Sequence, residues 1–113
     1  RQALGSKKGI SRYAFVLPMD EAEARVSLDL GGRSELVWDV DFQRDYVGDV
    51  PTEMWRHFFK SWTDHAAATL HVSCTADNDH HRIESIFKAW ARCLKAAVQQ
   101  DGSGAIPSSK GQL

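Results

Sequence analysis

Residues 69–97 read TLHVSCTADNDHHRIESIFKAWARCLKAA, and this stretch determines the fold. Its first part alternates apolar and polar residues, which predicts a short half-buried strand. The apolar positions of this strand are Leu70, Val72 and Cys74. After Asn78 or Asp79, either of which can cap a helix, apolar residues recur every three or four positions. These positions are Ile83, Ile86, Phe87, Trp90, Leu94 and Ala97. The stretch therefore predicts a strand that runs directly into an amphipathic helix.

Upstream, three further segments alternate with a period of two, at residues 13–19, 24–30 and 36–42. Short links separate them, so we expect an antiparallel meander with one wet face. A helix follows at residues 52–66, where Thr52 stands at the predicted N-cap behind a proline. The apolar stripe of this helix is Met54, Trp55, Phe58, Phe59, Trp62 and Ala66.

The predicted order is strand, strand, strand, helix, strand, helix, which indicates an α+β layer fold. One sheet should carry both helices on its apolar face. We place this domain at residues 10–101, after a polar connector at residues 1–9 and before a Gly/Ser/Pro-containing tail loop at residues 102–113. The chain begins at Arg1, from which we expect a piece of a longer protein.

Composition excludes several classes of protein. The chain has 113 residues with 14 Lys and Arg against 15 Asp and Glu, a net charge of −1, which argues against a polybasic nucleic-acid binder. A hydrophobic fraction of 42% excludes intrinsic disorder, and no apolar run approaches the roughly 20 residues that span a bilayer. Cys74 and Cys93 lack metal or redox spacing, so we expect buried thiols and a cytoplasmic location.

Three of the five histidines, His71, His80 and His81, fall within eleven positions. Adjacent helical residues point about 100° apart, so His80 and His81 cannot easily chelate one ion together. Glu84 lies three and four residues further on, and His71 has the parity that points away from the core. Imidazole and carboxylate ligands suit Mn, Fe, Zn, Co or Ni. A metal site completed by residues from elsewhere and an ordinary solvated helix start both remain open.

Several cationic residues can form an anion site. Lys88 follows Glu84 by one helical turn, and the tail sequence GSGAIPSSKG offers amides, hydroxyls and one lysine. The candidate anion-binding residues are Arg12, Arg33, Lys88, Ser108, Ser109 and Lys110. Each also has an ordinary interpretation as a helix-surface ion pair, a solvated charge or part of a terminal tail.

Four segments in this order make the sequence recognisable. They are SRYAFVLPMDEA (11–22), LDLGGR (28–33), NDHHRIESIFKAWARCLKAAV (78–98) and GAIPSSKG (104–111). Together they resemble the C-terminal part of the imidazoleglycerol-phosphate dehydratase family, over essentially the whole chain. The resemblance implies one of two β-β-β-α-β-α repeats, similar to the ribosomal protein S5 domain 2-like fold. It also implies a cytoplasmic enzyme of histidine biosynthesis.

The same resemblance implies a site with two Mn²⁺ ions, shared with the other repeat and with neighbouring subunits of a large homo-oligomer, a 24-mer. The metal ligands would be His71, His80, His81 and Glu84. The substrate-phosphate contacts would be Arg12, Arg33, Lys88, Ser108, Ser109 and Lys110. Asp20 and Glu84 are the candidate catalytic residues, with no proton-transfer step assigned to either.

The implied reaction is the loss of water from imidazole glycerol phosphate to give imidazole acetol phosphate, so the enzyme would be a hydro-lyase. The first repeat, with its own HHxxE helix, is absent from the 113 residues. We therefore expect this chain to be inactive on its own. The alternatives are a non-enzymatic metal- or anion-binding module of the same fold and, disfavoured by the near-neutral charge, a nucleic-acid-binding domain.

Overall fold

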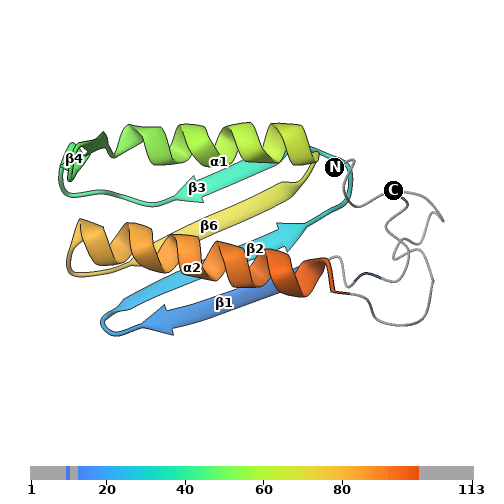
Figure 1. Ribbon diagram of the computed structural model, residues 1–113, viewed down its shortest axis with the longest axis horizontal. Coiled ribbons are helices and arrows are strands. Elements are labelled where there is room, and N and C mark those ends of the chain that lie inside the picture. Colours follow the sequence, from blue (N-terminus) through green and yellow to red (C-terminus); the bar gives the residue numbers. More distant parts are fainter. Residues whose placement is uncertain (1–9, 11–12, 100–113) are drawn as a thin grey trace.

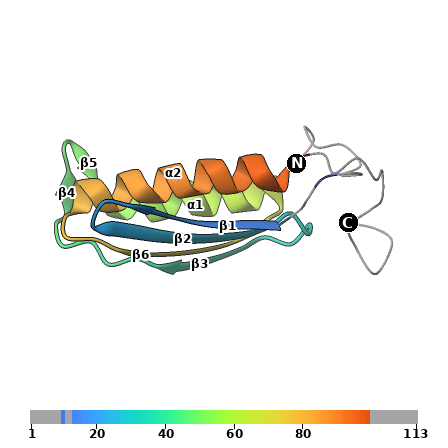
Figure 2. The ribbon, with the colours of Figure 1, turned by 90° about the horizontal axis from the view of Figure 1, so that it is seen from below.

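The computed structural model describes residue 10 and residues 13–99, and its elements follow the predicted order with one small addition. They are β1 (Tyr13–Met19), β2 (Ala22–Asp29), β3 (Glu35–Asp39), β4 (Tyr46–Val47), β5 (Val50–Pro51), α1 (Glu53–Ala66), β6 (Thr69–Thr75) and α2 (Asp79–Ala97). The main sheet has the strand order β1-β2-β6-β3 (Figure 1). Both helices cover one face of this sheet (Figure 2), which confirms the predicted α+β layer fold.

The expected meander is wrong, because β6 lies between β2 and β3. His71 of β6 is paired with Ser27 of β2 on one side and with Val37 of β3 on the other. β6 is antiparallel to β2 but parallel to β3, since α1 carries the chain back before β6 begins. An alternating pattern specifies which face of a strand is buried, but it does not specify the neighbouring strand.

The third strand is shorter than predicted. Its ladder ends at Asp39, although Val40 is buried and Phe42 packs against the core further along. The chain then forms a small hairpin of β4 and β5, which the sequence did not predict. Gly48 takes a φ of 59° at its turn, a conformation that glycine adopts freely. Two-residue strands are too short to produce a detectable period.

Thr52 occupies the predicted start of α1, but its side chain makes no capping hydrogen bond. Its hydroxyl donates instead to the carbonyl of Arg44 at 2.9 Å, and its amide donates to the carbonyl of Asp45 at 2.8 Å. Thr52 therefore closes the loop that contains the β4–β5 hairpin and fixes where α1 begins.

The core lies between the sheet and the helices. β2 buries every second residue from Ala22 to Leu28, as its pattern predicts, and β6 buries Leu70 and Val72. Phe59 of α1 is fully buried. The ring centroids around it lie at 5.1–5.5 Å and belong to Trp38, Phe58, Phe87 and Trp90. This aromatic cluster joins α1 to α2 and both helices to the sheet.

The predicted apolar stripe of α1 is only partly buried. Met54 is 49% exposed and Phe58 is 44% exposed. A single sheet covers only the inner side of the helices, so an apolar stripe wider than that side extends onto the outer surface. Periodicity indicates which residues share a helical face, but it does not show how much of that face is covered.

Replacing Phe59 tests this packing. Phe59→Ala should lower the free energy of unfolding by about 3–5 kcal/mol, because it removes a fully buried ring and leaves a cavity between the helices. Denaturant unfolding of the full-length protein measures the change. His57→Ala, on the exposed side of the same helix, serves as the control. Equal effects of the two changes would contradict this account of the core.

Candidate functional site

The first turn of α2 carries the His80-His81 pair and is capped as the sequence predicts. Asn78 has an extended backbone, with φ −141° and ψ 159°, and its side chain accepts the amide proton of His81 at 2.8 Å. This bond satisfies one of the free amides at the helix start. Both histidines are thereby fixed at the end of the sheet where β6 runs into α2 (Figure 1).

A buried ion pair between Asp79 and Arg82 holds the first turn of α2 in place. Asp79 is 5% exposed and Arg82 is 4% exposed, and Arg82 Nε donates to Asp79 at 3.3 Å. The amides of Gln43 and Arg44 also donate to Asp79, at 3.0 and 2.8 Å, and Arg82 Nη2 donates to the carbonyl of Ala76 at 3.0 Å. The ion pair therefore joins the first turn of α2 to the loop after β3 and to the segment after β6. The sequence did not reveal this pair, because charged residues in a helix are usually solvated.

These partners determine the ionisation of Asp79. Burial by itself would raise the pKa of its carboxyl, but the amides of Gln43 and Arg44 and the guanidinium of Arg82 outweigh burial and lower it. The carboxylate is therefore ionised wherever the fold is intact at neutral pH, and the pair contributes most to stability in that form.

His80, Glu84 and Lys88 lie one helical turn apart along one face of α2. His80 Nε2 is 3.6 Å from Glu84 Oε2, and Lys88 Nζ is 3.1 Å from Glu84 Oε1. The ion pair with Lys88 is the main reason that the pKa of Glu84 is lowered, and His80 and His81 add smaller effects. The ion pair holds Glu84 as a carboxylate, the form that can bind a metal ion.

His81 contacts a carboxylate from a distant part of the chain. Glu21, in the turn between β1 and β2, places Oε1 against His81 Nδ1, and its Oε2 accepts the amide proton of Asp77 at 3.0 Å. The Asp77 amide and the His81 ring lower the pKa of Glu21. Asp20, the candidate catalytic residue of the same turn, is exposed and has a φ of 51°. The alternating pattern predicts a short link here, but it does not indicate that Glu21 contacts His81.

A hollow of about 470 Å³ opens beside the two histidines. It is lined by Gln43, Arg44, Tyr46, Val47, Gly48, Asp77, Asn78, Asp79, His80 and His81. The unpredicted β4–β5 hairpin forms one of its walls. Because imidazoles, an arginine and carboxylates are among the lining residues, the hollow can take a small polar ligand.

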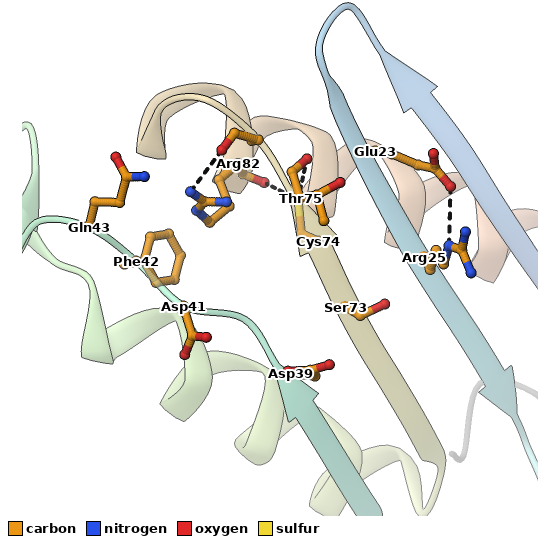
Figure 3. A pocket seen from close by; sticks show the side chains of 11 residues that line it. Glu23, Arg25, Asp39, Asp41, Phe42, Gln43, Ser73, Cys74, Thr75 and Arg82 are labelled. Atoms are coloured by element: carbon orange, nitrogen blue, oxygen red, sulfur yellow. Dashed lines mark hydrogen bonds and ion pairs between the residues drawn. The ribbon is translucent and has the colours of Figure 1, made fainter.

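A second hollow, of about 640 Å³, lies on the other side of Arg82 (Figure 3). It forms because β3 leaves β6 after the pairing of Asp39 with Ser73, so that the chain can reach Asp79. Two of the charges in view have partners, since Arg25 donates to Glu23 at 3.1 Å and Arg82 donates to Asp79. This hollow is therefore a consequence of the buried anchor.

The structure does not bring all the predicted site residues together. His71 is exposed on the helix-free face of β6, between Ser27 and Val37. Arg33 lies near Thr69, since the Thr69 hydroxyl donates to the carbonyl of Arg33 at 3.3 Å. Arg33 is therefore at the first residue of β6, at the end of the strand opposite to the start of α2. The six steps of β6 span about 20 Å. Within residue 10 and residues 13–99, no group of three His, Cys, Asp or Glu residues could hold a metal ion.

Other predictions fall where nothing is described. Arg12, Ser108, Ser109 and Lys110 lie outside the described residues, as do the connector at residues 1–9 and the tail loop at residues 102–113. The predicted domain boundary at residue 101 also lies there, while α2 itself ends at Ala97. Across residues 13–99, no helix is long and apolar enough to cross a membrane.

Comparisons with known proteins agree on one family. A family model for imidazoleglycerol-phosphate dehydratase matches residues 1–94. The chain is 54% identical over its whole length to the histidine biosynthesis bifunctional protein HisB of Spirosoma linguale, of which it covers 30%. It is also 54% identical, over 99% of its length, to the protein of the same name from Bacteroides fragilis, again covering 30%. The chain thus spans about a third of these curated relatives.

Solved structures show the same similarity. A crystal structure of imidazoleglycerol-phosphate dehydratase from Staphylococcus aureus matches with a TM-score of 0.83 and 36% identity, over 88% of this chain and 59% of that one. The enzyme from Pyrococcus furiosus, in complex with (S)-C348, matches with a TM-score of 0.78 and 26% identity, over 99% of this chain and 64% of that one. The observed arrangement of the sheet and helices is therefore shared by these proteins.

The buried anchor gives a testable pH dependence. Asp79→Asn should destabilise the full-length protein by about 3–5 kcal/mol at neutral pH, because it leaves Arg82 buried without its counter-charge. Folding lowers the pKa of Asp79. The contribution of Asp79 to the free energy of unfolding is therefore present above its pKa in the unfolded chain, near 4, and is lost as pH falls through its pKa in the folded protein.

Unfolding measured between pH 7 and pH 3 checks both statements. The difference between the parent protein and Asp79→Asn should shrink below about pH 4. A difference that stayed constant over this range would rule out the ionised carboxylate as its source. Asp41→Asn, an exposed carboxylate two residues before the anchored loop segment, is the matched control and should show little effect.

Proposed function

Because the chain belongs to the imidazoleglycerol-phosphate dehydratase family, we propose that the full-length protein removes water from imidazole glycerol phosphate to give imidazole acetol phosphate. This chain supplies the C-terminal half of the site. The observation that carries the proposal is that His80 and His81 line an open polar hollow, with Glu84 3.6 Å from His80.

The residues of the first turns of α2 fit a divalent metal such as Mn²⁺. Two ligand atoms about 2.1 Å from one ion lie about 3.0–3.6 Å apart for ligand angles of about 90–120°. The 3.6 Å between His80 Nε2 and Glu84 Oε2 falls within that range. Imidazole nitrogen and carboxylate oxygen also suit manganese in chemical type. His80 and Glu84 would therefore share one ion, and His81, which points to another side of the helix, would bind a second.

When bound, the metal would act as a Lewis acid that stabilises negative charge on the imidazole ring of the substrate as its carbon-bound proton is lost. The protein groups have the supporting roles. Lys88 holds Glu84 ionised through its 3.1 Å ion pair, so Glu84 stays available as an anionic ligand. The exposed ammonium of Lys88 can also attract the substrate phosphate. Asp20 stays a candidate catalytic residue to which no step is assigned.

The rest of the site must come from other polypeptide segments. His71, Arg33 and the first turn of α2 are too widely separated on this chain to meet one small substrate. The N-terminal repeat and neighbouring copies in a large homo-oligomer, a 24-mer, would supply the missing ligands and phosphate contacts. The distribution of cations supports this arrangement, because Arg33, in the loop after β2, lies beside Thr69, whereas Lys88 of α2 reaches Met19 at the end of β1. The 113-residue chain alone is therefore expected to be inactive.

Glu84→Gln and His80→Ala test the metal ligands. Each change should lower the Mn²⁺ content of the purified full-length protein and reduce kcat by more than about 100-fold, since even partners of metal ligands matter by 10–100-fold. Metal analysis and a dehydration assay provide the two measurements. His57→Ala, an exposed histidine of α1, should change neither.

The combination of outcomes separates the alternatives. Metal lost together with activity supports a metal-dependent dehydratase. Metal bound by His80 and Glu84 in a protein that dehydrates no imidazole glycerol phosphate would instead indicate a non-enzymatic metal-binding module. Retention of full metal content and turnover in both variants would refute the assigned site.

A further inference from the structure

Glu21 reaches His81 across a sequence separation of 60 residues. Two features fix its position. The β1–β2 hairpin pairs Met19 with Ala22, which leaves Glu21 in a tight two-residue turn. The second carboxylate oxygen of Glu21 accepts the amide proton of Asp77, in the segment between β6 and α2. Its first oxygen is thereby directed at one ring atom, His81 Nδ1.

The same ring nitrogen also faces a competing group. Asn78 Nδ2 lies 3.2 Å from His81 Nδ1. The orientation of the Asn78 amide is fixed, because its oxygen accepts the backbone amide proton of His81. Asn78 Nδ2 can only donate, so it would require a bare nitrogen, whereas an ionised carboxylate can only accept and requires a proton there. The two neighbours demand opposite states of Nδ1.

We expect His81 Nδ1 to carry the proton and to donate it to the Glu21 carboxylate. A hydrogen bond to an ionised group is roughly twice as strong as one between neutral groups. The Asp77 amide donates to the other oxygen of Glu21, and a hydrogen bond of this kind favours the ionised carboxylate. The nearby carboxylate of Asp79 cannot take its place, because Gln43, Arg44 and Arg82 already occupy it.

We propose that Glu21 is a positioning residue that holds His81 in the tautomer with hydrogen on Nδ1, so that Nε2 presents its lone pair to a metal ion. The second part rests on the proposed function. A carboxylate that accepts from the far nitrogen of a histidine ligand fixes both the tautomer and the ring orientation. A negative charge beside the N-terminus of α2 also offsets the unfavourable placement of histidines there.

Glu21→Gln is the informative substitution. Glutamine keeps the size of the side chain and an acceptor for the Asp77 amide, but it removes the charge and can donate to Nδ1. Glu23→Gln is the matched control, because Glu23 lies two residues away and instead accepts from Arg25 at 3.1 Å. Thermal unfolding of both proteins without metal reports any loss of the fold.

The direct measurement is solid-state NMR of the full-length protein, labelled with ¹⁵N-histidine, freed of metal by chelation and sedimented at alkaline pH, where imidazole is neutral. The His81 signals are assigned by their loss in His81→Gln. The parent protein and Glu23→Gln should show a protonated Nδ1 and a bare Nε2, and Glu21→Gln should lose this state. A bare Nδ1 in the parent, or an unchanged tautomer in Glu21→Gln, would overturn the proposal.

Calorimetric titration with Mn²⁺ tests the link to the metal. Affinity should fall about 10–100-fold in Glu21→Gln and stay within about twofold in Glu23→Gln. Unchanged affinity in Glu21→Gln would overturn the positioning role. If the parent binds no Mn²⁺ while the tautomer behaves as expected, the proposed metal site fails and the Glu21–His81 pairing stands alone.

Discussion

The ion pair of Asp79 and Arg82 is the interaction on which the site depends. Its carboxylate receives two backbone amides of the loop after β3, and its guanidinium binds the carbonyl of Ala76 after β6. Removing one partner would leave a buried charge without compensation. The pair therefore determines where α2 starts relative to the sheet, and with it where both adjacent histidines stand. Asn78 then caps a helix whose position is already fixed.

Much of the fold follows from the sequence because buried residues recur at the spacing of a strand or of a helix. Strand faces in β2 and β6, the start of α2 and the layer arrangement were all predictable, since each depends on neighbours within a few residues. The order of strands was not, because the insertion of β6 beside β3 depends on the path of α1. The exposed Phe58 illustrates the same limit, since a helical stripe does not reveal what covers it.

The candidate site divides in the same way. His80, His81, Glu84 and Lys88 were identifiable because they share one helix with regular spacing. The contact of Glu21 with His81 joins residues 60 positions apart, and no local pattern could show it. The position of His71 was predicted only in part. Its side chain is on the outer face of β6, as its parity indicates, but α2 covers the opposite face of the sheet.

The placement of Arg33 and the first turn of α2 at opposite ends of β6 has a genetic consequence (Figure 1). In the proposed assembly, the Arg33 contact to the phosphate and the metal ligands His80 and Glu84 of one site come from different copies. A copy that lacks Arg33 and a copy that lacks His80 would then carry their defects into different sites. Some sites in a mixed oligomer would contain neither defect, so two inactive alleles of this gene would complement each other.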